Sequence, residues 1–243
     1  MEERTHGGDI YGLERPVLDL SISLNPLGVP PCAIQAAREA LERSPAYPDP
    51  LCRGLRRAIS ARDGVPEDWV LCGNGASDLI DRLVRELECG GLLLLRALTK
   101  SYAMAGLRLG YCLSDDRALL AAMAEEGPPW PVSQLAQQAG ISALQYAPDW
   151  PFRVHQQLEE ERRYLSQELS RLRFHVYPSD SNFLLFQGEE GWRERLLDRG
   201  ILIRSCADFQ GLGPGFYRVC VRSRGENKRL IQAIQQEREA FHG

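Results

Sequence analysis

The sequence predicts an α/β protein, and three stretches of it carry that prediction. WVLCGNGASDLIDRLVRELE, from Trp69, reads as a short buried strand, a glycine turn and a helix. LLLLRAL, at residues 92–98, is apolar without alternation, which is typical of a strand buried on both faces. From Phe174 onwards the patterns read strand, helix, strand, strand and helix. Such alternation indicates layered α/β architecture, with a second, smaller α/β unit at the C-terminus.

The other elements follow in chain order from periodicity and turn residues. Residues 16–30 read as an extended apolar segment that ends at the turn Asn25-Pro26-Leu27-Gly28. Helical periodicity with charge on one face then recurs, interrupted by a proline-rich loop, SPAYPDP, and later by GPPWP. The predicted helices of this part lie at 31–43, 51–64, 117–127, 133–145 and 149–173.

Composition excludes several classes of function. The 243 residues carry 29 Lys and Arg against 33 Asp and Glu, so a net charge of -4 offers no footprint for nucleic acid or an anionic membrane. No stretch reaches the length of a membrane span, and the first residues have no apolar signal core. We therefore expect a soluble cytoplasmic protein that binds neither nucleic acid nor membrane.

The seven cysteines, at positions 32, 52, 72, 89, 112, 206 and 220, contain no CxxC pair and are odd in number. Most of them lie in apolar runs such as WVLCGNG and YRVCV. They are therefore interpreted as reduced core thiols of a cytosolic protein, and no metal site is predicted.

The stretch GNGAS, at residues 73–77, joins a predicted strand to a predicted helix. Glycine lets an anion approach the backbone, and the N–H groups at a helix N-terminus point at whatever occupies such a turn, so a phosphate pocket is one reading. A plain tight turn is the other reading, because glycine is common there for steric reasons. The stretch lacks a Walker lysine and the full GxGxxG spacing, which disfavours nucleotide binding.

One lysine and one arginine stand out in RALTKSYAMAGLRLGY, at residues 96–111. Lys100 follows an apolar strand, where desolvation would lower the pKa of its amine toward the nucleophilic form; a surface lysine at a strand end is the alternative. Arg108 lies in a glycine-containing, otherwise apolar turn and so needs an anionic partner, which a bound phosphate would supply.

Thr99-Lys100 followed by AGLRLG, at residues 105–110, resembles the lysine segment of fold type I pyridoxal-phosphate (PLP) enzymes of the aminotransferase class I/II family. The resemblance implies PLP as the cofactor, with Lys100 as the catalytic lysine that holds it through a Schiff base and Arg108 on its phosphate. Other motifs of the family follow in its order. They are Gly75, Ala76 and Ser77 for the phosphate turn, Thr99 beside the lysine, Tyr47 for the cofactor phosphate of the neighbouring subunit of a homodimer, and Arg218 for the substrate carboxylate.

Within this family, three features resemble the branch that contains threonine-phosphate decarboxylases of cobalamin biosynthesis and histidinol-phosphate aminotransferases. They are His6-Gly7-Gly8, SISLNPLG at 21–28, and GPPWPVS before the long helix. By resemblance, His6, Gly7 and Gly8 would bind the substrate phosphate, and the loop of Asn25 would line the pocket. A terminal residue without such a role is the alternative for His6.

The chain departs from the family between its phosphate-turn helix and its lysine strand. A long segment of the central sheet is absent there, since Cys89-Gly90-Gly91 leads directly into LLLLRAL. In the family this segment supplies the ring that stacks on PLP, the asparagine at its phenolic oxygen and the aspartate that keeps its pyridine nitrogen protonated. Ala97 also replaces a serine that meets the phosphate. Loss of the aspartate should weaken PLP as an electron sink.

The resemblance therefore implies a truncated fold type I PLP-transferase. Its parts would be an N-terminal substrate-side segment at 1–45, a truncated PLP-binding large domain at 46–149 and a complete small domain at 150–243. The strand before the phosphate turn, the antiparallel strand after the lysine segment and the lysine strand should remain side by side. We expect the outer edge of the lysine strand to lack a partner.

Three functions remain open from the sequence. The first is a PLP enzyme acting on a phosphorylated amino acid, as a decarboxylase or, alternatively, as a histidinol-phosphate-type aminotransferase. The second is a catalytically impaired remnant without enzymatic activity. A third, less favoured, is a small interaction module built on the C-terminal unit.

Overall fold

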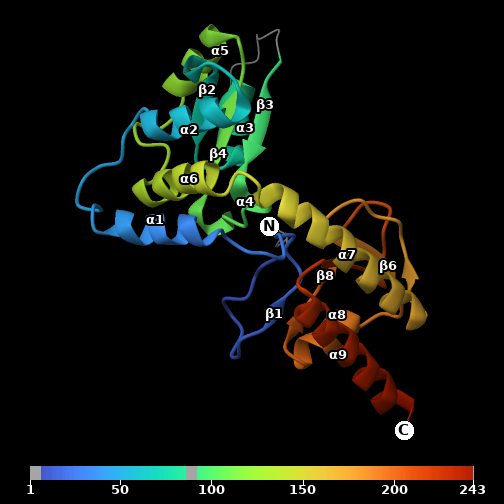
Figure 1. The fold of residues 1–243 in the computed structure, drawn as a ribbon. Helices are drawn as coiled ribbons and strands as arrows, with labels where there is room; N and C mark the ends of the chain where they lie inside the picture. Colours follow the sequence, from blue (N-terminus) through green and yellow to red (C-terminus); the bar gives the residue numbers. More distant parts are fainter. Residues whose placement is uncertain (1–6, 86–91, 243) are drawn as a thin grey trace. The chain divides into compact units, whose positions relative to one another are not determined.

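The structure is a computed structural model that describes residues 7–85 and 92–242. Two compact units compose the chain, and each is described by itself. One unit consists of residues 27–153, and the other combines the N-terminal residues up to Pro26 with residues 154–243. Figure 1 shows the ribbon of both units and labels their elements where there is room. Helices and strands recur in both, so the predicted α/β class is confirmed.

Three helices of the unit 27–153 pack on one another. Helix α6 contacts both α1 and α2. Proline at the first position of α1 suits the helix because its missing N–H would have no partner there. Their bounds are α1 Pro31–Leu41, α2 Arg53–Asp63 and α6 Gln134–Tyr146.

A three-stranded antiparallel sheet forms the rest of this unit, in the order β2-β4-β3. The prediction that these three strands remain side by side is confirmed. Helices α3 and α5 cover one face, where Leu79, Cys112 and Met123 are buried together. The bounds are β2 Val70–Gly73, α3 Ala76–Arg85, β3 Leu94–Ala97, β4 Gly110–Leu113 and α5 Arg117–Glu125; the short helices are η1 Glu67–Trp69, α4 Leu98–Ser101 and η2 Ala105–Leu107.

The edge strand β3 differs from its sequence prediction. Leu93 and Leu95 pack against the core, but Leu92 is 69% exposed and Leu94 is 45% exposed. Burial on both faces was therefore wrong, because only the face of Leu93 and Leu95 packs on the core, where α3 contacts the strand, and the other face is open to solvent. Within the described residues β4 is the only strand that pairs with β3. The unpaired edge was predicted correctly, and it carries apolar side chains.

The second unit contains a four-stranded antiparallel sheet in the order β5-β6-β9-β8. A short parallel pair, β1 with β7, joins the N-terminal segment to this unit through Leu18 and Ile201. Helices α8 and α9 and most of α7 belong to the same unit, and its core gathers Leu165, Phe186 and Ile234. The bounds are β1 Leu18–Asp19, α7 Trp150–Arg171, β5 His175–Val176, β6 Phe183–Gln187, α8 Trp192–Asp198, β7 Ile201–Leu202, β8 Arg204–Ser205, β9 Phe216–Cys220 and α9 Arg224–His242.

Candidate functional site

The turn between β2 and α3 is built around Gly75. Its φ of +83° is left-handed backbone, which glycine adopts without strain. A Cβ added at Gly75 would lie 2.8 Å from Nη2 of Arg108, so the guanidinium of Arg108 packs directly on the bare backbone of the turn. The structure thus brings together two residues that the sequence analysis assigned to the same phosphate.

A second glycine brings the sheet against this turn. A Cβ added at Gly110, the first residue of β4, would lie 2.7 Å from the backbone nitrogen of Ala76. Ala76 therefore begins α3 in direct contact with the strand that follows Arg108, and Ser77 is the next residue of the helix. The ten-residue helix α3 directs its N-terminus, with its partial positive charge, toward the turn.

The charges at the turn favour an anion. Arg108 is exposed, and no carboxylate of the described residues forms an ion pair with it. Asp78 is the acidic residue of the first turn of α3, but it accepts a hydrogen bond from the Asn74 backbone (2.7 Å) and pairs with Arg82 (2.7 Å). Its charge is thus compensated, and the turn, the helix end and Arg108 together fit a phosphate group.

Lys100 lies in the short helix α4 and is exposed. The expectation of a desolvated amine at the end of a buried strand was therefore wrong, because α4 follows an edge strand whose outer side meets no further strand within the described residues. The segment of Lys100 is nevertheless tied to that of Arg108, since the Leu98 N–H donates to the Leu109 carbonyl at 3.1 Å. Thr99, beside the lysine, is half-buried.

Tyr47 lies in the proline-rich loop before α2 and is 78% exposed. Its ring stacks on that of Trp130, from the GPPWP stretch, with centroids 4.2 Å apart. Periodicity gives no signal for such a contact between two loops, so the sequence analysis did not pair these residues.

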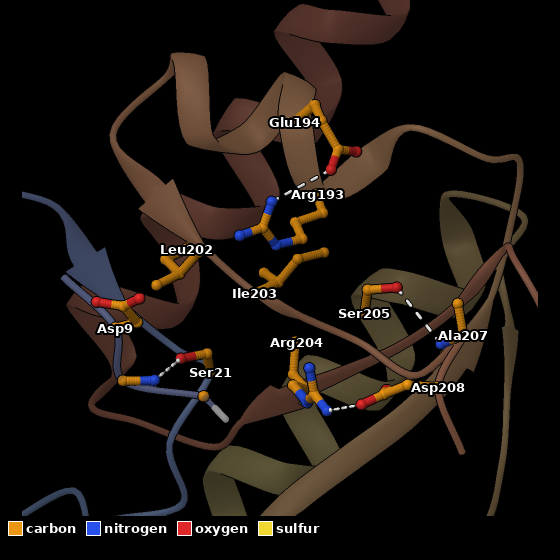
Figure 2. A pocket seen from close by; sticks show the side chains of 12 residues that line it. Asp9, Ser21, Arg193, Glu194, Leu202, Ile203, Arg204, Ser205, Ala207 and Asp208 are labelled. Atoms are coloured by element: carbon orange, nitrogen blue, oxygen red, sulfur yellow. Dashed lines mark hydrogen bonds and ion pairs between the residues drawn. The ribbon is translucent and has the colours of Figure 1, made fainter. Parts of the chain in front are cut away.

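A pocket in the second unit contains two of the predicted substrate residues. Gly7 and Gly8 line a cavity of about 350 Å³ together with Ser21. Figure 2 shows this pocket and labels Ser21 in it. The Gly8 N–H donates to the Ser21 hydroxyl at 2.8 Å, and a Cβ on Gly7 would lie 2.5 Å from the Ser21 carbonyl oxygen. His6 lies outside the described residues. Asn25 is buried, and it is not among the described residues that line this pocket.

Two arginines that were not predicted from the sequence, Arg193 and Arg204, also line this pocket (Figure 2). Each contacts a carboxylate, Glu194 at 3.2 Å and Asp208 at 2.6 Å respectively. The position of Arg204 beside Arg218 follows from the register between the strands of ILIRS (201–205) and FYRVC (216–220). Turn and strand patterns in the sequence do not determine that register.

Arg204 is also the direct cross-strand partner of the predicted Arg218, in the register between β8 and β9. Like charges directly opposite each other destabilise a sheet unless an anion compensates them. The guanidinium of Arg218 lies 5.0 Å above the Phe183 ring and reaches the Ser21 carbonyl at 3.5 Å. This end of the sheet thus presents two guanidiniums, of which Arg204 already has a carboxylate partner.

Among the residues that the structure describes, no helix combines the length and the apolar character that a membrane span needs. No cluster of three potential metal ligands occurs in the same part of the chain. Five of the six cysteines in this part are buried, as expected for core thiols.

Comparisons with known proteins give a family and a fold. A sequence model of the family "Aminotransferase class I and II" matches residues 75–234. A threonine-phosphate decarboxylase of Salmonella typhimurium is 27% identical over 348 aligned positions, which cover 95% of each chain. Because 348 exceeds the 243 residues available, this alignment contains a long stretch in which the present chain has no residue. Matches to several other curated relatives cover only 37–55% of their length.

Solved structures match in fold. A histidinol-phosphate aminotransferase from Clostridium acetobutylicum superposes with a TM-score of 0.80 at 19% identity, over 92% of this chain and 100% of that one. A histidinol-phosphate aminotransferase from Sinorhizobium meliloti, in complex with pyridoxal-5'-phosphate, gives 0.78 at 16% identity, over 92% of both chains. At such identities the likeness establishes the fold alone, and that fold is the one expected from the sequence.

Proposed function

Because the chain belongs to the aminotransferase class I and II family, we propose that it binds PLP at the Gly75 turn and acts on a phosphorylated amino acid. The observation that carries this proposal is the packing of Arg108 on the bare backbone of Gly75, 2.8 Å from the position of a Cβ. The phosphate end of the cofactor suits this turn for three reasons. The turn offers a glycine with left-handed backbone, the N-terminus of a helix, and an arginine without a carboxylate partner among the described residues.

When bound, PLP supplies an electron sink for the bond that breaks at the substrate Cα. In our proposal Lys100 is the amine that holds it covalently, and the same amine then moves the proton at that carbon. Arg108 and the first N–H groups of α3 fix the phosphate, which orients the cofactor relative to Lys100. Thr99, Ala76 and Ser77 complete the predicted contacts around it.

Two anionic groups identify the proposed substrate class. A phosphorylated amino acid carries a carboxylate and a phosphate, and the second unit holds Arg204 and Arg218 opposite each other on neighbouring strands. Arg218 is proposed to bind the carboxylate. The pocket of Gly7, Gly8 and Arg204 is proposed for the phosphate, with His6 contributing from the same N-terminal segment. The loop of Asn25 is proposed to line the substrate site outside this pocket.

Loss of carbon dioxide is our preferred reaction, as in a threonine-phosphate decarboxylase of cobalamin biosynthesis. The Salmonella typhimurium relative of that name aligns over 95% of both chains, which supports this preference. Transfer of the amino group, as in histidinol-phosphate aminotransferases, is the alternative. The choice between the two reactions would depend on how the site orients the substrate, and Arg218 would anchor the acid group in either case.

The long gap in that alignment supports another candidate, a remnant with impaired catalysis. No residue of the chain matches by motif the aspartate that holds the positive charge on the pyridine nitrogen. We further propose a cytoplasmic homodimer as the working form, since Tyr47 acts on a neighbouring subunit in our assignment. The odd number of cysteines and the absence of a CxxC pair support a reducing compartment.

The test is turnover by the native chain with two substrates. Threonine phosphate is assayed for release of carbon dioxide, and histidinol phosphate for amino transfer to an oxo acid. Lys100→Ala is the inactive control, and Lys228→Ala is the matched control, because these are the two lysines of the sequence. Release of carbon dioxide that depends on Lys100 would support the decarboxylase. Binding of PLP without either reaction would favour the impaired remnant.

A further inference from the structure

Tyr47 belongs to an aromatic pair at the surface of the unit 27–153. Its ring is stacked on that of Trp130, with centroids 4.2 Å apart and an angle of 15° between the planes. Both rings are nevertheless open to solvent, since Tyr47 is 78% and Trp130 is 44% exposed. An exposed tyrosine in a loop would otherwise sample several rotamers, so this contact restricts where its hydroxyl can lie.

A buried amide ties together the two loops that carry this pair. Gln137, on α6, is only 3% exposed, and its Nε2 donates to the carbonyls of Asp49 (2.9 Å) and Val132 (3.0 Å). Each of these carbonyls lies two residues from one of the stacked rings. The loops are therefore joined twice, by a ring contact at the surface and by hydrogen bonds beneath it.

The side chain of Tyr47 is open to solvent. Its hydroxyl has no hydrogen-bond partner within the described residues, and a side chain that is 78% exposed is not packed on the Gly75 turn of the same molecule. The paired loops thus hold a phenol in a restricted place where a ligand can reach it.

We propose that Trp130 and Gln137 are positioning residues that preorganise Tyr47 for the phosphate of PLP bound in a second copy of this chain. The inference rests on the proposed function, since it needs PLP at the Gly75 turn. Preorganisation lowers the conformational entropy that Tyr47 loses when it contacts the phosphate. It should therefore raise the affinity for PLP and leave the affinity for a ligand without the phosphate unchanged.

The first test compares PLP with pyridoxal, which lacks the phosphate. Trp130→Ala should weaken PLP binding about five- to tenfold, which corresponds to the loss of one aromatic pair. Pyridoxal binding should stay unchanged, and Trp130→Phe should stay near the native value because a ring remains. Gln137→Met, which fills the same space without the two hydrogen bonds, should behave like Trp130→Ala. Tyr146→Ala, at another exposed aromatic residue of the same unit, is the control.

The second test asks from which chain Tyr47 acts. Tyr47→Phe chains, which retain Lys100, are mixed with an excess of Lys100→Ala chains, which retain Tyr47. If Tyr47 acts across a dimer, the mixture contains complete sites, and the affinity of the Tyr47→Phe chains for PLP returns to the native value. If it acts within its own chain, the affinity stays weak in the mixture, and the inference is overturned.

The two proposals fail in different ways. Native chains that bind neither PLP nor pyridoxal would refute the proposed function, and this inference with it. If the Trp130→Ala and Gln137→Met variants bind PLP as tightly as the native chain does, the inference is overturned and the proposed function stands. Circular dichroism of each variant verifies that the comparison is made between folded chains.

Discussion

Substituting Gly75 by alanine tests the phosphate turn, because two effects can be separated there. A left-handed φ costs an alanine about 1–2 kcal/mol of stability. In addition, the new Cβ would lie 2.8 Å from Nη2 of Arg108, so the guanidinium must move. That movement should change the free energy of unfolding little, because only the end of a flexible side chain is displaced. It would, however, remove a charge-assisted hydrogen bond to the phosphate. Such a bond contributes about 1.5–3 kcal/mol.

Two other glycines separate the effects. Gly64 also has a positive φ, +68°, but no atom lies within 4 Å of its Cβ position; Gly106 has free space at that position and no left-handed φ. We expect Gly75→Ala and Gly64→Ala to lower the free energy of unfolding by similar amounts in urea titrations, and Gly106→Ala to change it little. Only Gly75→Ala should weaken PLP, by about 10- to 100-fold.

Pyridoxal serves as the internal control of this comparison. The loss at Gly75→Ala should be confined to PLP, because pyridoxal offers no phosphate to Arg108. Equal affinity of Gly75→Ala and Gly64→Ala for PLP would refute the assignment of this turn, since the two variants share backbone strain and differ in the contact with Arg108.

Three further predictions concern stability and association. Burial alone would raise the pKa of Glu226, but hydrogen bonds from Ser223 and the charge of Arg222 outweigh it, so its pKa lies below the ordinary 4.5. The stabilisation by Glu226 is therefore complete above pH 4.5 and is lost as the pH falls through the folded-state pKa. The difference in unfolding free energy between native and Glu226→Gln chains should therefore shrink in acid. A difference that stays constant with pH would refute this. Glu161→Ala should cost about 1–3 kcal/mol, since the buried amide of Asn227 loses its acceptor at 2.9 Å; an unchanged urea midpoint would count against it. Leu94→Lys should reduce self-association, measured by light scattering, because a lysine on an exposed edge strand disfavours pairing with another chain. Unchanged scattering would argue that the chains do not associate through this edge.

The sequence predicted those features that depend on local pattern. The order β2-β4-β3 and the turn at Gly75 followed from apolar runs, glycine and the resemblance to a family. The burial of β3 and of Lys100 was predicted wrongly, because burial depends on the elements packed around a strand, and this chain lacks the segment that precedes LLLLRAL in the family. An apolar run indicates that a strand can be buried, but whether its side chains are buried depends on the elements packed around it.

Contacts between distant loops and strands could not be read from the sequence. Arg204 faces Arg218 because of the register between β8 and β9, which two-residue and five-residue strands do not specify by pattern. The bridge from Gln137 to Asp49 and Val132 depends on where α6 packs. Both features lie close to residues that the motifs had indicated, so the motifs located the regions and the structure supplied the partners.

The most direct test of the account is where PLP attaches. The native chain is incubated with PLP and reduced with borohydride, and its peptides are mapped by mass spectrometry. With only Lys100 and Lys228 in the sequence, the side-chain result is a choice between two residues. We predict label on Lys100, retained in Lys228→Ala and lost in Lys100→Ala. Label on Lys228 alone, or none on either lysine, would contradict the assignment of the cofactor site.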